Sequence, residues 1–274
     1  MNPKSAILTV SFGTSYAQTR QMTIEPIENL IQSEVSSYFG DHFLFYHAWT
    51  SKIILRKISE RDQLFIPTVR EAFQQMLFDG ISQVYVQPTH ILPGVENEQM
   101  IQDAMQFHSD FDSIQFGSPL LTSLEDHMHF IHSLSKQLAD LSMEEAVVLM
   151  GHGTSHFCNT AYAALDYEFK DQGYSNFFVG TVEAYPGLEN ILRGLKKSSF
   201  HRILLMPLMV VAGDHAQNDM TGSSPDSWEN ILKANGFQVR SHIQGLGELS
   251  FVRQMFADHL MSIIPSESAE NLPS

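Results

Sequence analysis

Two histidines and a glutamate in the second half of the chain carry side chains that commonly bind a divalent metal ion, and each follows a strand-like apolar segment. The segments and the residues that follow them are 146–150 with His152, 177–182 with Glu183, and 203–209 with His215. Because the carboxyl ends of parallel strands lie along one edge of a sheet, the three side chains are predicted to meet there. Two imidazoles and a carboxylate suit a cation such as Co, Fe, Ni or Zn.

An ordinary structural role, without a metal, explains the two histidines less well than it explains the glutamate. The chain has 13 histidines, and a histidine is more often a surface or core residue than a ligand. His152 and His215, however, lie beside Gly153 and Gly213, in turns where backbone and ligand can approach closely. Glu183 could instead cap the helix that is predicted to follow it.

Alternating strands and helices must position these residues. Strands are predicted at 5–12, 42–49, 83–87 and 113–116, and again at 146–150, 177–182, 203–209 and 237–242. Helices are predicted at about 18–38, 52–57, 66–78, 95–107, 123–140, 159–172, 185–197, 225–235 and 248–262. This alternation predicts an α/β fold with parallel sheets of about four strands flanked by helices.

The two halves of the chain also resemble each other. The segment F-G-T-S-Y at 12–16 matches H-G-T-S-H at 152–156, and P-T-H-I-L-P-G-V-E at 88–96 aligns with P-L-M-V-V-A-G-D-H at 207–215. We therefore expect two pseudo-symmetric, Rossmann-like lobes. The N-terminal lobe is predicted to span 1–140, and the C-terminal lobe, which carries the metal-site residues, 141–274.

Charge and composition limit the classes of partner. The 274 residues include 16 Lys plus Arg and 31 Asp plus Glu, a net charge of −15 that argues against nucleic acid or a membrane as a partner. The single cysteine, Cys158, excludes an intrachain disulfide. A strand-like N-terminal segment in place of a signal peptide, and the lack of a long apolar run, predict a cytoplasmic protein. A homo-oligomer is left open.

Several longer segments resemble one known family. They are A-W-T-S-K-I-I at 48–54, P-T-H-I-L-P-G at 88–94, M-G-H-G-T at 150–154, V-G-T-V-E-A-Y-P at 179–186, P-L-M-V-V-A-G-D-H-A-Q-N-D-M-T-G at 207–222 and D-S-W at 226–228. On these segments the chain resembles the class II tetrapyrrole chelatases, and closely the anaerobic sirohydrochlorin cobaltochelatases of the CbiK family. The resemblance implies a chelatase-like fold and insertion of Co2+ into sirohydrochlorin, in the early-cobalt-insertion route of cobalamin biosynthesis.

The resemblance also implies roles for the three residues. The family's metal and catalytic positions correspond to His152, Glu183 and His215. Metallation replaces two pyrrole N–H protons by one divalent cation, and a neutral imidazole can accept such a proton. We expect His152 to be the catalytic base, with His90 as a second candidate. Co2+ is then a substrate, with Fe2+ or Ni2+ as alternatives, and no prosthetic group is needed.

The ring substrate carries many carboxylates, which helix N-termini can bind through backbone N–H groups. The glycine-containing turns at 13–15 and 153–155 precede two predicted helices. The residues expected to contact the substrate are Ser11, Thr14, Ser15, His90 and Thr154.

Other functions stay open at this point. A ferrochelatase or nickel chelatase acting on a related tetrapyrrole would use the same ligand types, because these ligands do not discriminate among Co2+, Fe2+ and Ni2+. A non-catalytic carrier of a tetrapyrrole or a metal would bind without turnover. A metallohydrolase is disfavoured because the sequence has no H-E-x-x-H motif.

Overall fold

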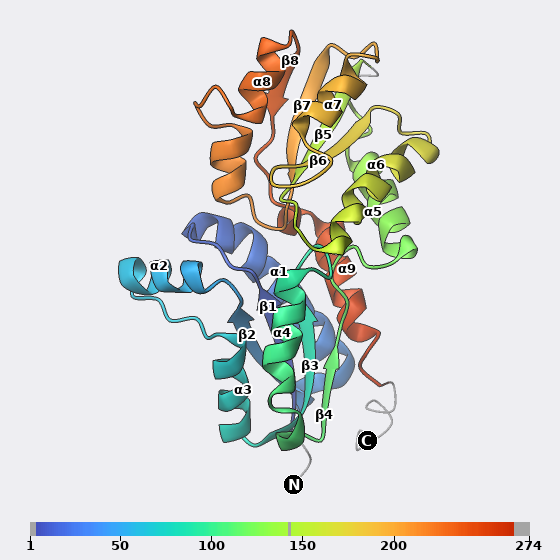
Figure 1. Cartoon of the computed structure of the whole chain (residues 1–274). Coiled ribbons are helices and arrows are strands. Elements are labelled where there is room, and N and C mark those ends of the chain that lie inside the picture. The colour runs from blue at the N-terminus through green and yellow to red at the C-terminus, as the bar shows by residue number, and fades with distance from the viewer. Residues whose placement is uncertain (1–3, 142–143, 266–274) are drawn as a thin grey trace. The chain divides into compact units, whose positions relative to one another are not determined.

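The chain folds into two compact units, each built on its own parallel sheet (Figure 1). The computed structural model describes residues 4–141 and 144–265. Unit 1 contains the described residues of Met1–Leu120 and Gly247–Ser274, and unit 2 contains those of Leu121–Leu246. Each unit has, among these residues, a four-stranded sheet flanked by helices, which confirms the predicted fold class.

The sheet of unit 1 has the strand order β2-β1-β3-β4, with every neighbouring pair parallel. Its strands are β1 (Lys4–Ser11), β2 (Phe43–Trp49), β3 (Ile81–Pro88) and β4 (Ser113–Phe116). Its helices are α1 (Ala17–Phe39), α2 (Lys52–Asp62), α3 (Val69–Phe78), α4 (Val95–Met105) and α9 (Ser250–Met261). Short 3-10 turns occupy Gly40–His42 and His108–Asp110, and a further one, Leu246–Glu248, begins on the last residue of unit 2.

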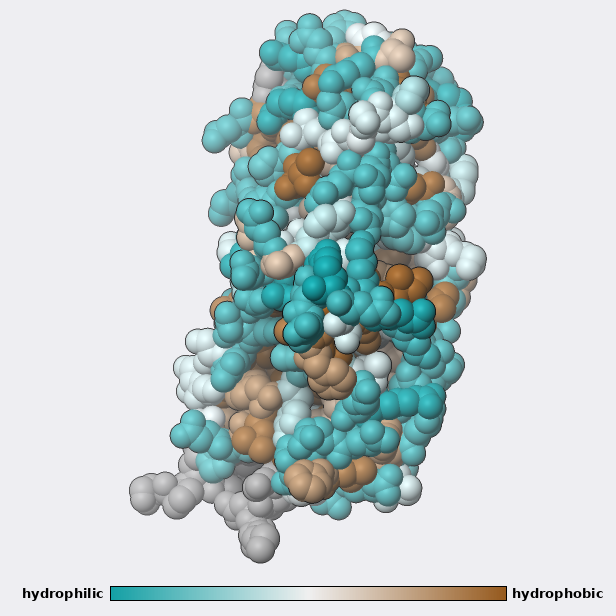
Figure 2. Space-filling view, turned by 90° about the vertical axis from the view of Figure 1, so that its left-hand side faces the viewer, coloured by the Kyte–Doolittle hydropathy of each residue, from teal (hydrophilic) through white to brown (hydrophobic). Residues whose placement is uncertain are grey.

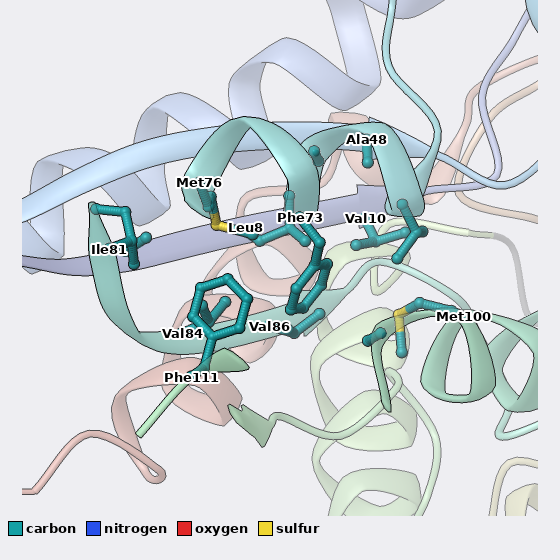
Figure 3. Close-up of a cluster of buried hydrophobic side chains, with 14 residues drawn as sticks. Leu8, Val10, Ala48, Phe73, Met76, Ile81, Val84, Val86, Met100 and Phe111 are labelled. Carbon is teal, nitrogen blue, oxygen red and sulfur yellow. The ribbon is translucent and has the colours of Figure 1, made fainter. Parts of the chain in front are cut away.

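One face of this sheet forms a hydrophobic core with α3 and α4. Alternate residues of β1, Leu8 and Val10 among them, point toward Phe73 on α3 and Met100 on α4 (Figure 3). A strand that is buried on both faces is apolar at most positions, and β1 accordingly carries Ala6, Ile7, Leu8 and Val10, interrupted by the buried Thr9. The helices α1 and α9 pack against each other, and α9 also packs against β3.

The sheet of unit 2 has the corresponding order β6-β5-β7-β8, again parallel throughout. Its strands are β5 (Glu145–Gly151), β6 (Phe177–Thr181), β7 (Arg202–Leu208) and β8 (Gln238–Ser241). Its helices are α5 (Leu124–Gln137), α6 (Thr160–Asp171), α7 (Leu188–Leu195) and α8 (Trp228–Ala234), with short turns at Phe157–Asn159 and Ala216–Met220. All residues of β5 are buried, as expected for a central strand between two neighbours.

The contacts group the chain differently from the sequence-based lobes 1–140 and 141–274. Helix α5 belongs to unit 2 and packs on α6, where His127 Nδ1 lies 2.6 Å from Glu168 Oε2. Helix α9 belongs to unit 1, where Gln254 Nε2 donates to Glu34 Oε1 of α1 at 2.8 Å. Both groupings depend on packing between segments far apart in the sequence, which periodicity does not reveal.

Several helices begin later than predicted, for local reasons. The helix expected from 66 begins at Val69, because Thr68 caps it in a reciprocal capping box with Glu71. The helix expected from 185 begins at Leu188, after Pro186 and the N-cap Gly187. The π-helical turn Ala216–Met220 lies in a stretch for which no regular element was predicted.

The face of the molecule seen in Figure 2 is largely hydrophilic, with apolar side chains in small, separate groups. This pattern agrees with the excess of acidic residues. Among residues 4–141 and 144–265, none of the helices combines the length and the apolar character required to cross a membrane.

Candidate metal centre

His152, Glu183 and His215 converge at the carboxyl edge of the sheet in unit 2. One ligand atom from each residue lies within 4.8 Å of the corresponding atoms of the other two. The strand order explains this convergence, because β5 lies between β6 and β7 and all three strands run in the same direction. Ligand atoms at about 2.0–2.2 Å from one ion lie at most about 4.4 Å apart, so side-chain shifts of a few tenths of an ångström bring all three atoms onto one ion.

Two glycines allow the tight turn that carries His152. A Cβ on Gly151 would lie 2.4 Å from the ring of Tyr162. Gly153 has φ +89°, and a Cβ there would lie 2.9 Å from both Ala184 and Thr181. Larger residues would therefore push the turn away from helix α6 and from the segment that follows β6.

Backbone hydrogen bonds then bring Glu183 beside His152. The N–H of Val182 donates to the carbonyl of Gly151 at 3.0 Å, and the N–H of Glu183 donates to the carbonyl of His152 at 2.9 Å. These bonds extend the pairing of β5 with β6 beyond the ends of both strands. As a result, Glu183 Oε2 lies 3.8 Å from His152 Nδ1, with both side chains about half exposed.

A hydrogen bond to the backbone sets the tautomer of the His152 ring. Its Nδ1 lies 2.7 Å from the carbonyl oxygen of Gly153. A carbonyl oxygen only accepts hydrogen bonds, so this contact places the proton on Nδ1 and leaves the lone pair of the neutral ring on Nε2. The nitrogen that is free to bind a metal or to accept a proton is therefore Nε2.

Tyr162 supports the same turn from helix α6. Burial raises the pKa of its hydroxyl to about 12. Hydrogen bonds from the backbone of Gly153 and His152 lower the pKa and so offset part of this rise. The side chain therefore stays a neutral phenol at physiological pH. Tyr162 joins helix α6 to the turn, and it was not among the residues predicted to form the site.

Asp219 is a second residue that sequence reasoning missed. Its Oδ2 lies 2.6 Å from Nδ1 of His215. The available signal was the spacing of four residues between His215 and Asp219, which places two side chains on one face of a helical turn. A spacing of four residues indicates a contact only where the segment is known to be helical.

Thr154 takes part in the loop that borders the site. Its N–H donates to Asn159 Oδ1 at 3.0 Å, and its hydroxyl accepts from the N–H of His156 at 3.1 Å. Asn159 Nδ2 in turn donates to the carbonyl of Tyr185 at 2.5 Å, which ties this loop to the one that carries Glu183. The helical segment then begins at a cap formed by His156, so its first turn is the 3-10 turn Phe157–Asn159.

The predicted substrate residues of the first half lie in unit 1, at the carboxyl edge of its sheet. Ser11, Thr14, Ser15 and His90 are all buried, with at most 8% of their surface exposed. Ser11 shares a hydrogen bond of 2.8 Å with Thr89. Buried polar side chains therefore gather at this edge of the sheet.

His90 is the most unusual member of this group. Neither of its ring nitrogens has a hydrogen-bond partner among the described residues. Burial lowers the pKa of His90 to about 4, although the nearby Asn97 side chain partly opposes this shift. The ring is therefore neutral at physiological pH, and both of its nitrogens stay available to a ligand.

Comparison with protein families shows the family to which this chain belongs. The family model described as "Cobalt chelatase (CbiK)" matches residues 5–265. The chain belongs to the cobalt chelatase family. The match covers both units, so membership does not rest on the metal-site motifs alone.

Individual cobalt chelatases are similar over most of their length. The sirohydrochlorin cobaltochelatase of Salmonella typhimurium is 37% identical over 257 residues, which cover 94% of this chain and 95% of the relative. The sirohydrochlorin cobaltochelatase CbiKC of Nitratidesulfovibrio vulgaris is 32% identical over 220 residues, 79% of this chain and 77% of the relative.

Solved structures share the fold of this cobalt chelatase at lower identity. SirB from Bacillus subtilis, determined with Fe3+, superposes with a TM-score of 0.64 at 17% identity, over 98% of this chain and 96% of that one. CbiX, the terminal enzyme of siroheme biosynthesis in denitrifying bacteria, gives 0.54 at 13% identity, over 95% of this chain and 100% of that one. At these identities the likeness concerns the fold only.

Proposed function

We propose that His152, Glu183 and His215 hold the Co2+ ion that this cobalt chelatase inserts into sirohydrochlorin. The observation that carries the proposal is the convergence of three metal-binding side chains within 4.8 Å at one sheet edge. Membership of the cobalt chelatase family and the names of the two curated relatives support the reaction and favour Co2+ over Fe2+ or Ni2+. They also favour an enzyme over a non-catalytic carrier.

In the proposed mechanism, Glu183 and His215 hold the ion while His152 receives a proton. Two pyrrole N–H bonds of the ring break, each electron pair stays on its nitrogen, and both nitrogens bind the cation. Nε2 of His152 can accept one of these protons because the ring's other nitrogen, Nδ1, already donates to Gly153, and the second proton passes to bulk water. A nitrogen bound to the metal cannot accept a proton, so His152 releases the ion as the ring takes it.

We assign contact with the ring substrate to Ser11, Thr14, Ser15, His90 and Thr154. The unpaired nitrogens of His90 among the described residues support its part in this set, because a buried polar atom without a partner costs about 1–3 kcal/mol. A ligand that supplies the missing hydrogen bond recovers that cost. We also place the reaction in the cytoplasm, in the early-cobalt-insertion route to cobalamin.

An anaerobic assay with purified protein, sirohydrochlorin and Co2+, Fe2+ or Ni2+ in turn tests the proposal. The absorbance change of the ring reports metallation. We expect catalytic turnover that is fastest with Co2+. Faster turnover with Fe2+ or Ni2+ would reassign the metal, and binding of the ring without acceleration over the protein-free rate would identify a carrier.

A further inference from the structure

We propose that Asp219 is a positioning residue that fixes His215 with Nε2 directed at the metal and makes His215 the stronger of the two histidine ligands. The inference rests on the proposed metal role of His152, Glu183 and His215. It extends that role to a residue that touches neither the ion nor the ring.

The contact itself determines which nitrogen of His215 can bind metal. Nδ1 of His215 lies 2.6 Å from Oδ2 of Asp219. A carboxylate oxygen accepts a hydrogen bond but does not donate one, so Nδ1 must carry the proton. The lone pair of the neutral ring then lies on Nε2, on the opposite side of the ring.

The local backbone holds the two residues in this relationship. His215 is the N-cap of the π-helical turn Ala216–Met220, which contains Asp219. Ala216 and Met220 are completely buried in the core of unit 2, which anchors the turn at both ends. Single π-helical turns of this kind occur frequently at functional sites.

A close backbone contact ends the turn. The N–H of Gly222 donates to the carbonyl of Asn218 at 3.0 Å, and a Cβ on Gly222 would lie 2.2 Å from that same carbonyl oxygen. The hydroxyl of Thr221 also donates to the carbonyl of Ala216 at 3.1 Å. Asp219 therefore projects from a backbone that is fixed on both sides, and its carboxylate can hold the imidazole without large motions of its own.

His152 provides the comparison. Its Nδ1 also donates to an oxygen, but this oxygen belongs to the neutral carbonyl of Gly153. A carboxylate partner polarises an imidazole more strongly than a carbonyl does, and so raises its strength as a metal ligand. The structure therefore assigns unequal parts to the two histidines. His215 stays bound to the ion, whereas His152 can dissociate from it.

The inference is tested by binding of Co2+ alone, followed through the visible d–d absorption of the ion, without the ring. Removing an outer carboxylate of this kind typically weakens metal binding by about 10–100-fold, which we expect for Asp219→Ala. Asp219→Asn keeps an oxygen that accepts the hydrogen bond and lacks the charge, so we expect a smaller loss. The exposed residue Asp171 on α6 supplies a matched control, because Asp171→Asn changes the net charge equally and should bind Co2+ normally.

Two further results separate this inference from the proposed metal site. Loss of Co2+ binding in His215→Ala together with normal binding in Asp219→Ala would overturn the role of Asp219 alone. Normal binding in His215→Ala would overturn the metal site itself. Equal losses in Asp219→Asn and Asp171→Asn would show a general effect of charge and would also contradict the positioning role.

Steady-state kinetics give an independent readout. A positioning residue for the metal should raise the KM for Co2+ and leave the KM for sirohydrochlorin nearly unchanged. Thermal unfolding of each variant, followed by circular dichroism, checks that the fold is intact. A rise in the KM for the ring alone would contradict the inference.

Discussion

The rings of His152 and His215 meet edge to face, with their centroids 4.4 Å apart and their planes at 85°. Each ring has its Nδ1 bound to an oxygen of its own loop, so neither needs the other as a hydrogen-bond partner. Two neutral rings can lie this close at little cost, because an edge-to-face arrangement is favourable for aromatic groups. Both rings therefore keep Nε2 free of these contacts, as a metal ligand requires.

Replacing His152 should abolish turnover and leave the fold intact. The side chain is about half exposed, so we expect His152→Ala to change the free energy of unfolding by no more than about 0.5 kcal/mol. Metallation of sirohydrochlorin by Co2+, followed by absorbance, measures the loss. His129→Ala, on the exposed side of α5, is the matched control and should keep full activity. Full activity in His152→Ala would remove this residue from the mechanism.

The turn around His152 should not tolerate a side chain at Gly153. Gly153→Ala meets an unfavourable φ of +89° and also a contact of 2.9 Å with Ala184. Gly173 has φ +90°, but a Cβ there would meet nothing within 4 Å among the described residues, so Gly173→Ala measures the backbone cost alone, about 1–2 kcal/mol. We expect Gly153→Ala to lower the melting temperature further and to reduce turnover. Equal shifts in the two variants would show that the contact with Ala184 relaxes freely.

His90 should make the fold sensitive to acid. Because burial lowers its pKa from 6.5 to about 4, the folded state resists protonation, and stability falls as the pH drops from about 6.5 toward 4. His90→Leu removes this group, so we expect a smaller loss of stability over that range in urea unfolding. The exposed His108 serves as control, since His108→Leu should leave the acid dependence unchanged. If His90 also contacts the ring, the KM for sirohydrochlorin rises in His90→Leu alone.

Glu28 on α1 should make the fold less stable as the pH rises, whereas His90 makes it less stable as the pH falls. Burial raises its pKa from 4.5 to about 7, with a smaller contribution from Glu25, although the Thr9 hydroxyl and Arg20 lower it. The folded state therefore binds the proton more tightly than the unfolded chain, and stability falls as the pH rises from about 4.5 through 7.

Glu28→Gln should consequently gain stability over the native chain as the pH is raised from 5 to 8, by on the order of 1–3 kcal/mol. Melting temperatures at both pH values test this. Glu60→Gln, at an exposed position of α2, should show no such gain. A constant difference between Glu28→Gln and the native chain at both pH values would contradict the assignment.

The strands and the convergence of His152, Glu183 and His215 were predictable because each residue follows a strand with a clear apolar pattern. The apolar run before His152 predicted a central strand, and β5 is buried at every position. The same reasoning missed Asp219 and Tyr162, because both act through a turn or a helix face whose geometry is set by packing. It also placed α9 in the C-terminal lobe, because the sequence of a helix does not show which sheet the helix packs against.

The return of α9 to unit 1 has a consequence for the order of events during synthesis. Every residue of unit 2 leaves the ribosome before α9, which unit 1 needs to cover α1 and β3. Unit 2 can therefore complete its sheet while unit 1 still exposes apolar surface. The unit that carries His152, Glu183 and His215 can thus fold first, and unit 1 must wait for helix α9.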